Sequence, residues 1–99
     1  MQTMKAIQIH SYGGPEVLKF EDVSRPVLND DDVLIKVLAA GVNPVDWKIR
    51  QGYMEGMLTL PLILGWDVAG IIEEKGQKVT SLEIGDSVYT RQDLLRNGA

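Results

Sequence analysis

The sequence predicts a mainly β protein, an antiparallel barrel or sandwich with short helical segments. Ten glycines and four prolines among 99 residues provide many turns, which favours short strands over long helices. Residues 33–40 are almost continuously apolar and rich in β-branched side chains, as a strand requires. Turn signals at residues 76–78 and 83–86 follow each other closely, as they do between antiparallel strands.

Size and charge restrict the classes of function. A chain of 99 residues that is 44% hydrophobic fits one small domain with a modest core, and two domains would not fit. The net charge of −4 leaves no basic surface for a nucleic-acid backbone, so we expect no nucleic-acid partner. The chain lacks cysteine, a secretory signal and a membrane-length apolar run. We therefore expect a cytoplasmic protein without a membrane partner.

The N-terminal third predicts two strands joined by a turn. Residues 4–10 alternate polar and apolar side chains, which predicts a half-buried strand. Residues 11–15, Ser-Tyr-Gly-Gly-Pro, predict a turn. Residues 16–23 resume an extended pattern that ends before Pro26. The acidic run at residues 29–32 predicts a solvated turn without a chemical role.

Residues 33–40 predict the core strand of the domain. Only Lys36 interrupts the apolar run, so we expect the strand to be buried on much of both faces. Asn43 and Pro44 predict a helix start, since Asn caps helices and Pro is favoured at their first position. The helix is expected over residues 44–50 and should stop at Gly52.

The C-terminal half predicts an irregular loop followed by two strands. Residues 53–60 form a loop with exposed apolar side chains, and residues 68–74 form a second core strand. Gly70 inside this strand predicts a bend or a close approach of another backbone. Residues 87–90 predict a short strand, and the polar tail at 91–99 has helical character before a final turn. We expect the sheet to be incomplete at its C-terminal end.

Two stretches have the character of a binding site. Residues 39–53 and 65–70 each join an apolar, strand-like flank to a loop in which Gly and Pro set the backbone. Three polar side chains in these loops, Asn43, Asp46 and Asp67, are left to face something, as the side chains of a site do.

An ordered series of short motifs runs through the whole chain. It comprises Lys5-Ala-Ile, Gly14-Pro-Glu-Val-Leu, residues 33–37, Ala40-Gly-Val-Asn-Pro-Val-Asp, Ile49-Arg-Gln-Gly, Pro61, Gly65-Trp-Asp-Val-Ala-Gly, Val79 and Gly85-Asp-Ser-Val. This series resembles the N-terminal part of the medium-chain dehydrogenase/reductases, and within them the zinc-free quinone oxidoreductase branch. The resemblance implies that residues 1–99 form a GroES-like distorted β-barrel, which in the family packs against a separate Rossmann domain that binds NADPH.

The resemblance also implies a reaction without zinc. Zinc-dependent relatives have Cys at the position of Asn43, a hydroxyl residue at that of Val45, and a His-Glu pair at Trp66 and Asp67, with a four-Cys lobe after Thr90. A catalytic zinc needs three protein ligands of this kind, and only Asp67 offers one here. We therefore expect no metal. Hydrogen-bond donors and proton delivery would have to stabilise the negative charge that develops on the substrate oxygen.

Asn43 and Tyr53 are the candidate catalytic residues. Asn43 could orient the nicotinamide carboxamide, which makes it the candidate cofactor-binding residue too, or hold the substrate oxygen. It could also merely cap the turn before Pro44. The family resemblance favours a place beside the nicotinamide. Tyr53 could donate its phenol proton to the substrate or lie against a ring, or it could be a half-exposed aromatic that covers the core.

Three further residues are expected to support the pocket or its loops. Asp46 could act as a general acid or support the loops; an ordinary aspartate is a poor proton donor at neutral pH, so it is expected to accept hydrogen bonds from residues 65–70. Trp66 either narrows the pocket or packs in the core. Asp67 either lines the cleft or is an ordinary turn carboxylate. Charged groups on the short helix, Lys48 and Arg50, are expected to serve solubility, and the single histidine, His10, is given no role.

Three hypotheses for function follow. In the first, the parent protein is an NADPH-dependent reductase of quinones or α,β-unsaturated carbonyls, and these residues form one wall of its cleft. No G-x-G-x-x-G fingerprint occurs, so the Rossmann domain is expected to be absent and the chain alone inactive. In the second, the chain is a stand-alone binding or assembly barrel. In the third, it has no independent activity. An open sheet edge would favour a homodimer or strand-exchanged oligomer.

Overall fold

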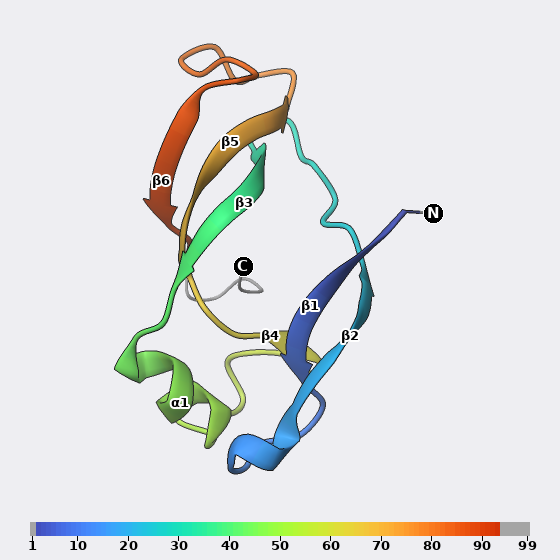
Figure 1. The fold of residues 1–99 in the computed structure, drawn as a ribbon, viewed down its shortest axis with the longest axis vertical. Helices are drawn as coiled ribbons and strands as arrows, with labels where there is room; N and C mark the ends of the chain where they lie inside the picture. The colour runs from blue at the N-terminus through green and yellow to red at the C-terminus, as the bar shows by residue number, and fades with distance from the viewer. Residues whose placement is uncertain (1, 94–99) are drawn as a thin grey trace.

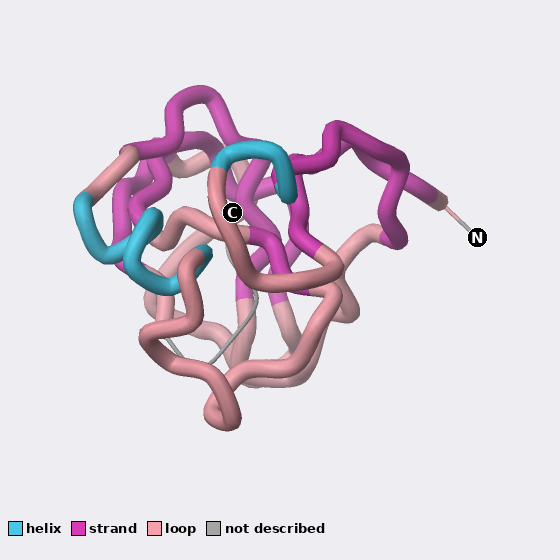
Figure 2. The backbone as a smooth tube through the Cα atoms, turned by 90° about the horizontal axis from the view of Figure 1, so that it is seen from below, coloured by secondary structure: helices cyan, strands magenta, loops and turns pink. Residues whose placement is uncertain are grey.

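The computed structural model describes residues 2–93 and confirms the mainly β prediction (Figure 1). The elements follow in the order β1 (Thr3–Ile9), the 3-10 turn η1 (Pro15–Val17), β2 (Leu18–Ser24), β3 (Val33–Gly41), α1 (Pro44–Arg50), β4 (Leu62–Ile63), β5 (Asp67–Lys75) and β6 (Ser87–Arg91). No helix within residues 2–93 is long and apolar enough to cross a membrane. Viewed from below, the two helical segments lie at the near end, with strands behind them (Figure 2).

The first sheet is antiparallel and has the strand order β2-β1-β4. Its register pairs Ile7 with Phe20 on β2, and Gln8 with Ile63 on β4. The alternating pattern at residues 4–10 correctly predicted β1. Pro15 starts η1 instead of an extended segment, so β2 begins at Leu18, later than the sequence pattern suggested.

The second sheet is also antiparallel and has the order β3-β5-β6. Gly70 in the central strand confirms the predicted close approach of two backbones. A Cβ atom on Gly70 would lie 2.0 Å from the carbonyl oxygen of Lys36 on β3. No side chain fits there, so the residue type at position 70 determines how closely β3 and β5 pair.

The prediction that the strand at residues 33–40 is buried on both faces is wrong. From position 36 to position 40 every side chain of β3 is exposed, and Leu38 is 65% exposed. The reason is that β3 is an edge strand of its sheet in residues 2–93, while the central strand β5 carries the buried Val68 and Ile72. An apolar run alone does not distinguish a central strand from an edge strand.

The main hydrophobic cluster lies between the first sheet and α1. Ile9 of β1, Ile49 of α1, Leu62 of β4 and Trp66 are all buried and pack together. The loop at residues 53–60 only partly fits its prediction, because Met54 and Leu58 pack against this cluster whereas Tyr53 and Met57 are exposed. Helix α1 is thereby held to the first sheet by its buried face.

Polar contacts connect the two sheets. Arg25, just after β2, places Nη2 3.0 Å from Glu73 Oε2 and 3.3 Å from Glu74 Oε2 on β5. The acidic turn presents mostly exposed side chains, as predicted, but its backbone is hydrogen-bonded to the turn after β5. The amide of Gly76 donates to the carbonyl of Asp32 at 2.8 Å. The predicted helical character and final turn of the tail fall largely at residues 94–99, outside the described residues.

Candidate functional site

The two predicted loops meet at Asn43 and Asp67. Antiparallel pairing places Gly41, the last residue of β3, opposite Asp67, the first residue of β5. Asn43 follows two residues later, and its Nδ2 donates a hydrogen bond of 2.6 Å to Asp67 Oδ2. A Cβ atom on Gly41 would lie 2.9 Å from the Cβ of Asp67, so Gly41 leaves the space that Asp67 needs. The site therefore lies where β3 ends and β5 begins.

Asp46 holds the other side of Asn43. Asn43 and Asp46 stand in capping-box positions at the start of α1. Asp46 Oδ2 accepts a hydrogen bond of 3.0 Å from the Asn43 backbone N–H. The expectation that Asp46 accepts from residues 65–70 is wrong, because its partner lies in its own turn. Asp46 is 8% exposed, and its Oδ1 is buried without a hydrogen-bond partner among the described residues.

Trp66 and Asp67 are neighbours in sequence with different surroundings. Trp66 is 2% exposed and packs with Ile9, Ile49 and Leu62, so it is a core residue and does not line the groove described below. Asp67 is only partly buried and faces Asn43. Of the two alternatives left open for Trp66, its burial agrees with core packing. Asp67 lines the groove described below.

Tyr53 lies beyond the end of α1, with its backbone N–H 3.0 Å from the carbonyl of Lys48. Its side chain is 74% exposed, so the alternative of a half-exposed aromatic that covers the core is wrong. The phenol is accessible to a ligand, but Tyr53 is not among the residues that line the groove beside Asp67. Asn43 is likewise not among the residues that line this groove; it reaches the groove only through its hydrogen bond to Asp67.

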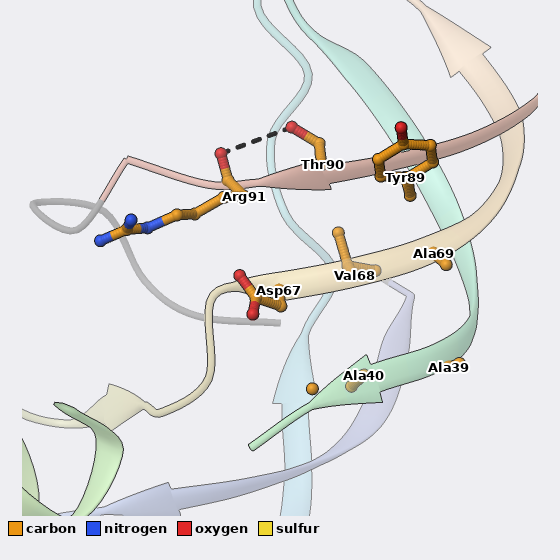
Figure 3. Close-up of a pocket in the computed structure, with 9 residues that line it drawn as sticks. Ala39, Ala40, Asp67, Val68, Ala69, Tyr89, Thr90 and Arg91 are labelled. Carbon is orange, nitrogen blue, oxygen red and sulfur yellow. Dashed lines mark hydrogen bonds between the residues drawn. The ribbon is translucent and has the colours of Figure 1, made fainter. Parts of the chain in front are cut away.

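An open groove of about 570 Å³ lies beside Asp67 across the second sheet (Figure 3). Its floor is made of small and apolar residues from the end of β3 and the start of β5. The third strand contributes Tyr89, Thr90 and Arg91, which the sequence reasoning did not single out. Arg91 is the cross-strand partner of Asp67. That pairing depends on the register of β6, for which the sequence carried no signal beyond a short strand.

Lys48, Arg50 and His10, which were not expected to act in the site, each contact another residue of the chain. Arg50 Nε donates to the carbonyl of Gly13 at 3.1 Å, and the Lys48 ammonium lies 5.8 Å from the centre of the Trp47 ring. His10, which the sequence gave no partner, pairs through Nε2 with Glu21. Glu21 also accepts from Gln8 Nε2 at 2.7 Å. These hydrogen bonds, that of Gln8 first and that of His10 second, lower the pKa of Glu21.

The donor groups at the site do not fit a catalytic zinc. Residues 2–93 contain no cluster of three His, Cys, Asp or Glu side chains able to hold a metal. Asp67, the one carboxylate at the positions considered, already accepts the amide of Asn43, and Trp66 is buried in the core. A catalytic zinc needs three sulfur, imidazole or carboxylate ligands, and these positions do not offer them.

Comparison with known proteins identifies the family. Residues 29–98 match the model of the alcohol dehydrogenase GroES-like domain. The chain is 50% identical over 92 residues to quinone oxidoreductase from Sus scrofa, covering 92% of this chain and 28% of that protein. The chain therefore spans little more than a quarter of the length of this relative.

Solved structures agree with the sequence match. Quinone oxidoreductase from Coxiella burnetii has a TM-score of 0.89 at 39% identity, over 94% of this chain and 31% of that one. The Escherichia coli quinone oxidoreductase complexed with NADPH has a TM-score of 0.84 at 31% identity, over 90% and 27%. The predicted GroES-like fold is thus confirmed. The chain belongs to the alcohol dehydrogenase GroES-like domain family, in the quinone oxidoreductase branch of the medium-chain dehydrogenase/reductases.

Proposed function

We propose that the chain is the substrate-side domain of an NADPH-dependent oxidoreductase that reduces quinones or α,β-unsaturated carbonyls without zinc. The observation that carries this proposal is the contact of 2.6 Å between Asn43 and Asp67 beside the groove. Relatives named quinone oxidoreductase, and a related structure complexed with NADPH, support it. Both substrate classes present a conjugated carbonyl whose oxygen gains negative charge during reduction.

The nucleotide would be held mainly by a separate Rossmann domain. Bound NADPH supplies the hydride for the reduction. On this chain Asn43 fits the nicotinamide end, because an amide side chain complements the carboxamide with both a donor and an acceptor. Asn43 is fixed at its backbone by Asp46 and at its side chain by Asp67. A group held at two points loses little freedom when a ligand binds, which favours a defined geometry.

Tyr53 is the proposed proton donor or ring contact of the domain. Its exposed phenol can donate a hydrogen bond to a substrate oxygen that the complete cleft brings to it. Replacing Tyr53 by Phe removes only the hydroxyl. In the complete protein we expect Tyr53→Phe to lower the rate while leaving the affinity for NADPH unchanged. A rate unchanged in Tyr53→Phe but lowered in Tyr53→Ala would assign Tyr53 to ring contact alone.

A pair of activity measurements tests the proposal. The complete protein is expected to oxidise NADPH with a quinone or an enone as the acceptor, and to keep this activity after treatment with a metal chelator. The isolated 99-residue chain is expected neither to bind NADPH at micromolar concentration nor to reduce a quinone. Micromolar NADPH binding by the isolated chain would contradict the proposal that a separate Rossmann domain holds most of the nucleotide. A complete protein that reduces neither substrate would favour a binding or assembly module.

Two further properties belong to the same proposal. We propose a cytoplasmic location, in line with the absence of cysteine from the sequence. We also propose that copies of this chain associate through the second sheet, because β3 and β6 are its edge strands among residues 2–93 and leave backbone groups open to pairing. The product would be a homodimer or a strand-exchanged oligomer.

A further inference from the structure

We infer that Asp67 is a positioning residue that fixes the orientation of the Asn43 side-chain amide, so that Asn43 presents its oxygen to the carboxamide of the nicotinamide. This inference rests on the function proposed above. It concerns a residue to which sequence reasoning gave only two general alternatives, a lining of the cleft or a turn carboxylate.

The first step is the chemistry of the contact. An ionised carboxylate accepts hydrogen bonds and cannot donate one, whereas the Asn amide donates only through Nδ2. Asn43 Nδ2 lies 2.6 Å from Asp67 Oδ2 in a partly buried position. If the amide were rotated by half a turn, two oxygen acceptors would face each other at this distance. The contact therefore selects one amide orientation, with Oδ1 on the branch that points away from Asp67.

The second step is the rigidity of the arrangement. The backbone N–H of Asn43 donates to Asp46 Oδ2 at 3.0 Å, and Asp46 is itself buried. On the other side, Gly41 leaves the only room for Asp67, since a Cβ atom there would lie 2.9 Å from the Cβ of Asp67 and 3.3 Å from Oδ2. The position of each partner is thus restricted by a neighbour, and the orientation of the amide is built in before any ligand binds.

The third step is the consequence for recognition. With Nδ2 engaged, Asn43 offers Oδ1 as an acceptor and one remaining N–H. A carboxamide can use both groups, because its amino group donates to Oδ1 and its oxygen accepts the remaining N–H, whereas a quinone or enone oxygen can use only the N–H. Of the two ligand roles considered for Asn43, this orientation favours the carboxamide over the substrate oxygen.

The contact itself can be measured on the isolated chain by NMR. In uniformly labelled protein we expect a scalar coupling across the hydrogen bond between Asn43 Nδ2 and the Asp67 carboxylate carbon. In Asp67→Asn we expect the Asn43 side-chain resonances to shift and their protons to exchange faster with water. Asp22→Asn is the matched control, because Asp22 forms an exposed ion pair with Lys5 on the other sheet. Absence of the coupling in the unaltered chain would overturn the inference, even if Asp67→Asn failed to fold.

The effect on recognition is tested in the complete reductase with two cofactors. One is NADPH and the other is its acetyl analogue, in which a methyl group replaces the amino group of the carboxamide. The unaltered enzyme should prefer NADPH by about two- to tenfold, as expected for one hydrogen bond. Asp67→Asn should lose this preference, because an Asn at position 67 can pair with either end of the Asn43 amide, whereas Asp22→Asn should keep it.

The outcomes separate the inference from the function on which it rests. An undiminished preference in Asp67→Asn would overturn the positioning role while leaving the reductase proposal intact. Binding of neither cofactor by the complete, unaltered protein would overturn the proposed function and the nicotinamide part of the inference. The coupling measured on the isolated chain would then still decide whether Asp67 orients Asn43.

Discussion

The two sheets of this domain differ in how they use their apolar residues. On the first sheet, Ile9 and Leu62 pack with α1 and Trp66 into one buried cluster. On the second sheet the buried side chains Val68 and Ile72 both belong to the central strand, and the edge strands are largely exposed. From this difference we expect changes in the cluster beside the first sheet to cost more stability than changes on the second sheet, where the groove lies.

The two regions meet between consecutive residues. Trp66 belongs to the buried cluster, and Asp67 starts β5 and holds Asn43. The site residue Asp67 thus directly follows a residue of the core. Changes in the first region should therefore alter the free energy of unfolding, and changes at the groove should alter ligand binding more than stability.

The largest effect is expected for Trp66→Ala. Truncating a buried aromatic side chain removes its packing and leaves a cavity, at a cost of about 3–5 kcal/mol in the free energy of unfolding. Leu38→Ala on the exposed part of β3 should stay within about 0.5 kcal/mol of the unaltered chain. Urea unfolding followed by circular dichroism measures both. Equal losses in the two variants would contradict the comparison between the sheets.

A smaller effect is expected for Gly70→Ala, which acts within the second sheet. The added Cβ would meet the Lys36 carbonyl at 2.0 Å, so β3 and β5 must separate. We expect a loss of about 1–3 kcal/mol, as for other overpacked sites. Ala69→Ser, which adds one atom at the next residue on the groove side, is the control and should cost clearly less. A stability unchanged in Gly70→Ala would show that the strands pair less closely than described.

Association through the second sheet should respond to a charge on its edge. Tyr89 on β6 is 88% exposed, and Tyr89→Lys is expected to weaken self-association by about tenfold or more, because edge lysines oppose pairing. Phe20→Lys, on the edge strand β2 of the first sheet, provides the comparison. Light scattering over a concentration series distinguishes the two. A chain that remains monomeric at high concentration would contradict the proposed association.

The smallest effect concerns the Glu21 contacts on the first sheet. Gln8 and His10 lower the pKa of Glu21, so the ionised form is favoured in the folded state. This stabilisation is complete above the unfolded value of about 4.3 and is lost as the pH falls through the lower folded value. The difference in stability between the unaltered chain and Glu21→Gln should therefore be larger at neutral pH than at strongly acidic pH.

Local patterns predicted much of this fold. Three features depend only on neighbouring residues and were predicted from them. They are strand β1 from the alternation at residues 4–10, the start of α1 from Asn-Pro, and the close contact of β5 with β3 from Gly70. The burial of β3 could not be predicted in this way, because it depends on the order of strands in the sheet. Only the three-dimensional pairing makes β3 an edge strand.

The sequence pointed to several residues of the candidate site but not to the contacts between them. Asn43 and Asp67 were both singled out, but their hydrogen bond depends on the register that places Gly41 opposite Asp67. The predicted partner of Asp46 is wrong because its carboxylate accepts the Asn43 backbone N–H in a capping interaction within its own turn. Arg91 and Tyr89 join the groove only through the pairing of β6 with β5, which leaves no mark in local sequence.

The most direct test of the central claim is Asn43→Ala in the complete protein, with turnover of NADPH and a quinone measured beside thermal unfolding. The proposed function predicts that turnover falls by at least about tenfold, because the nicotinamide loses its orienting contact. It predicts little change in Tm, since Asn43 lies outside the buried cluster. Turnover unchanged together with a clearly lower Tm would contradict the account and leave Asn43 as a helix cap alone.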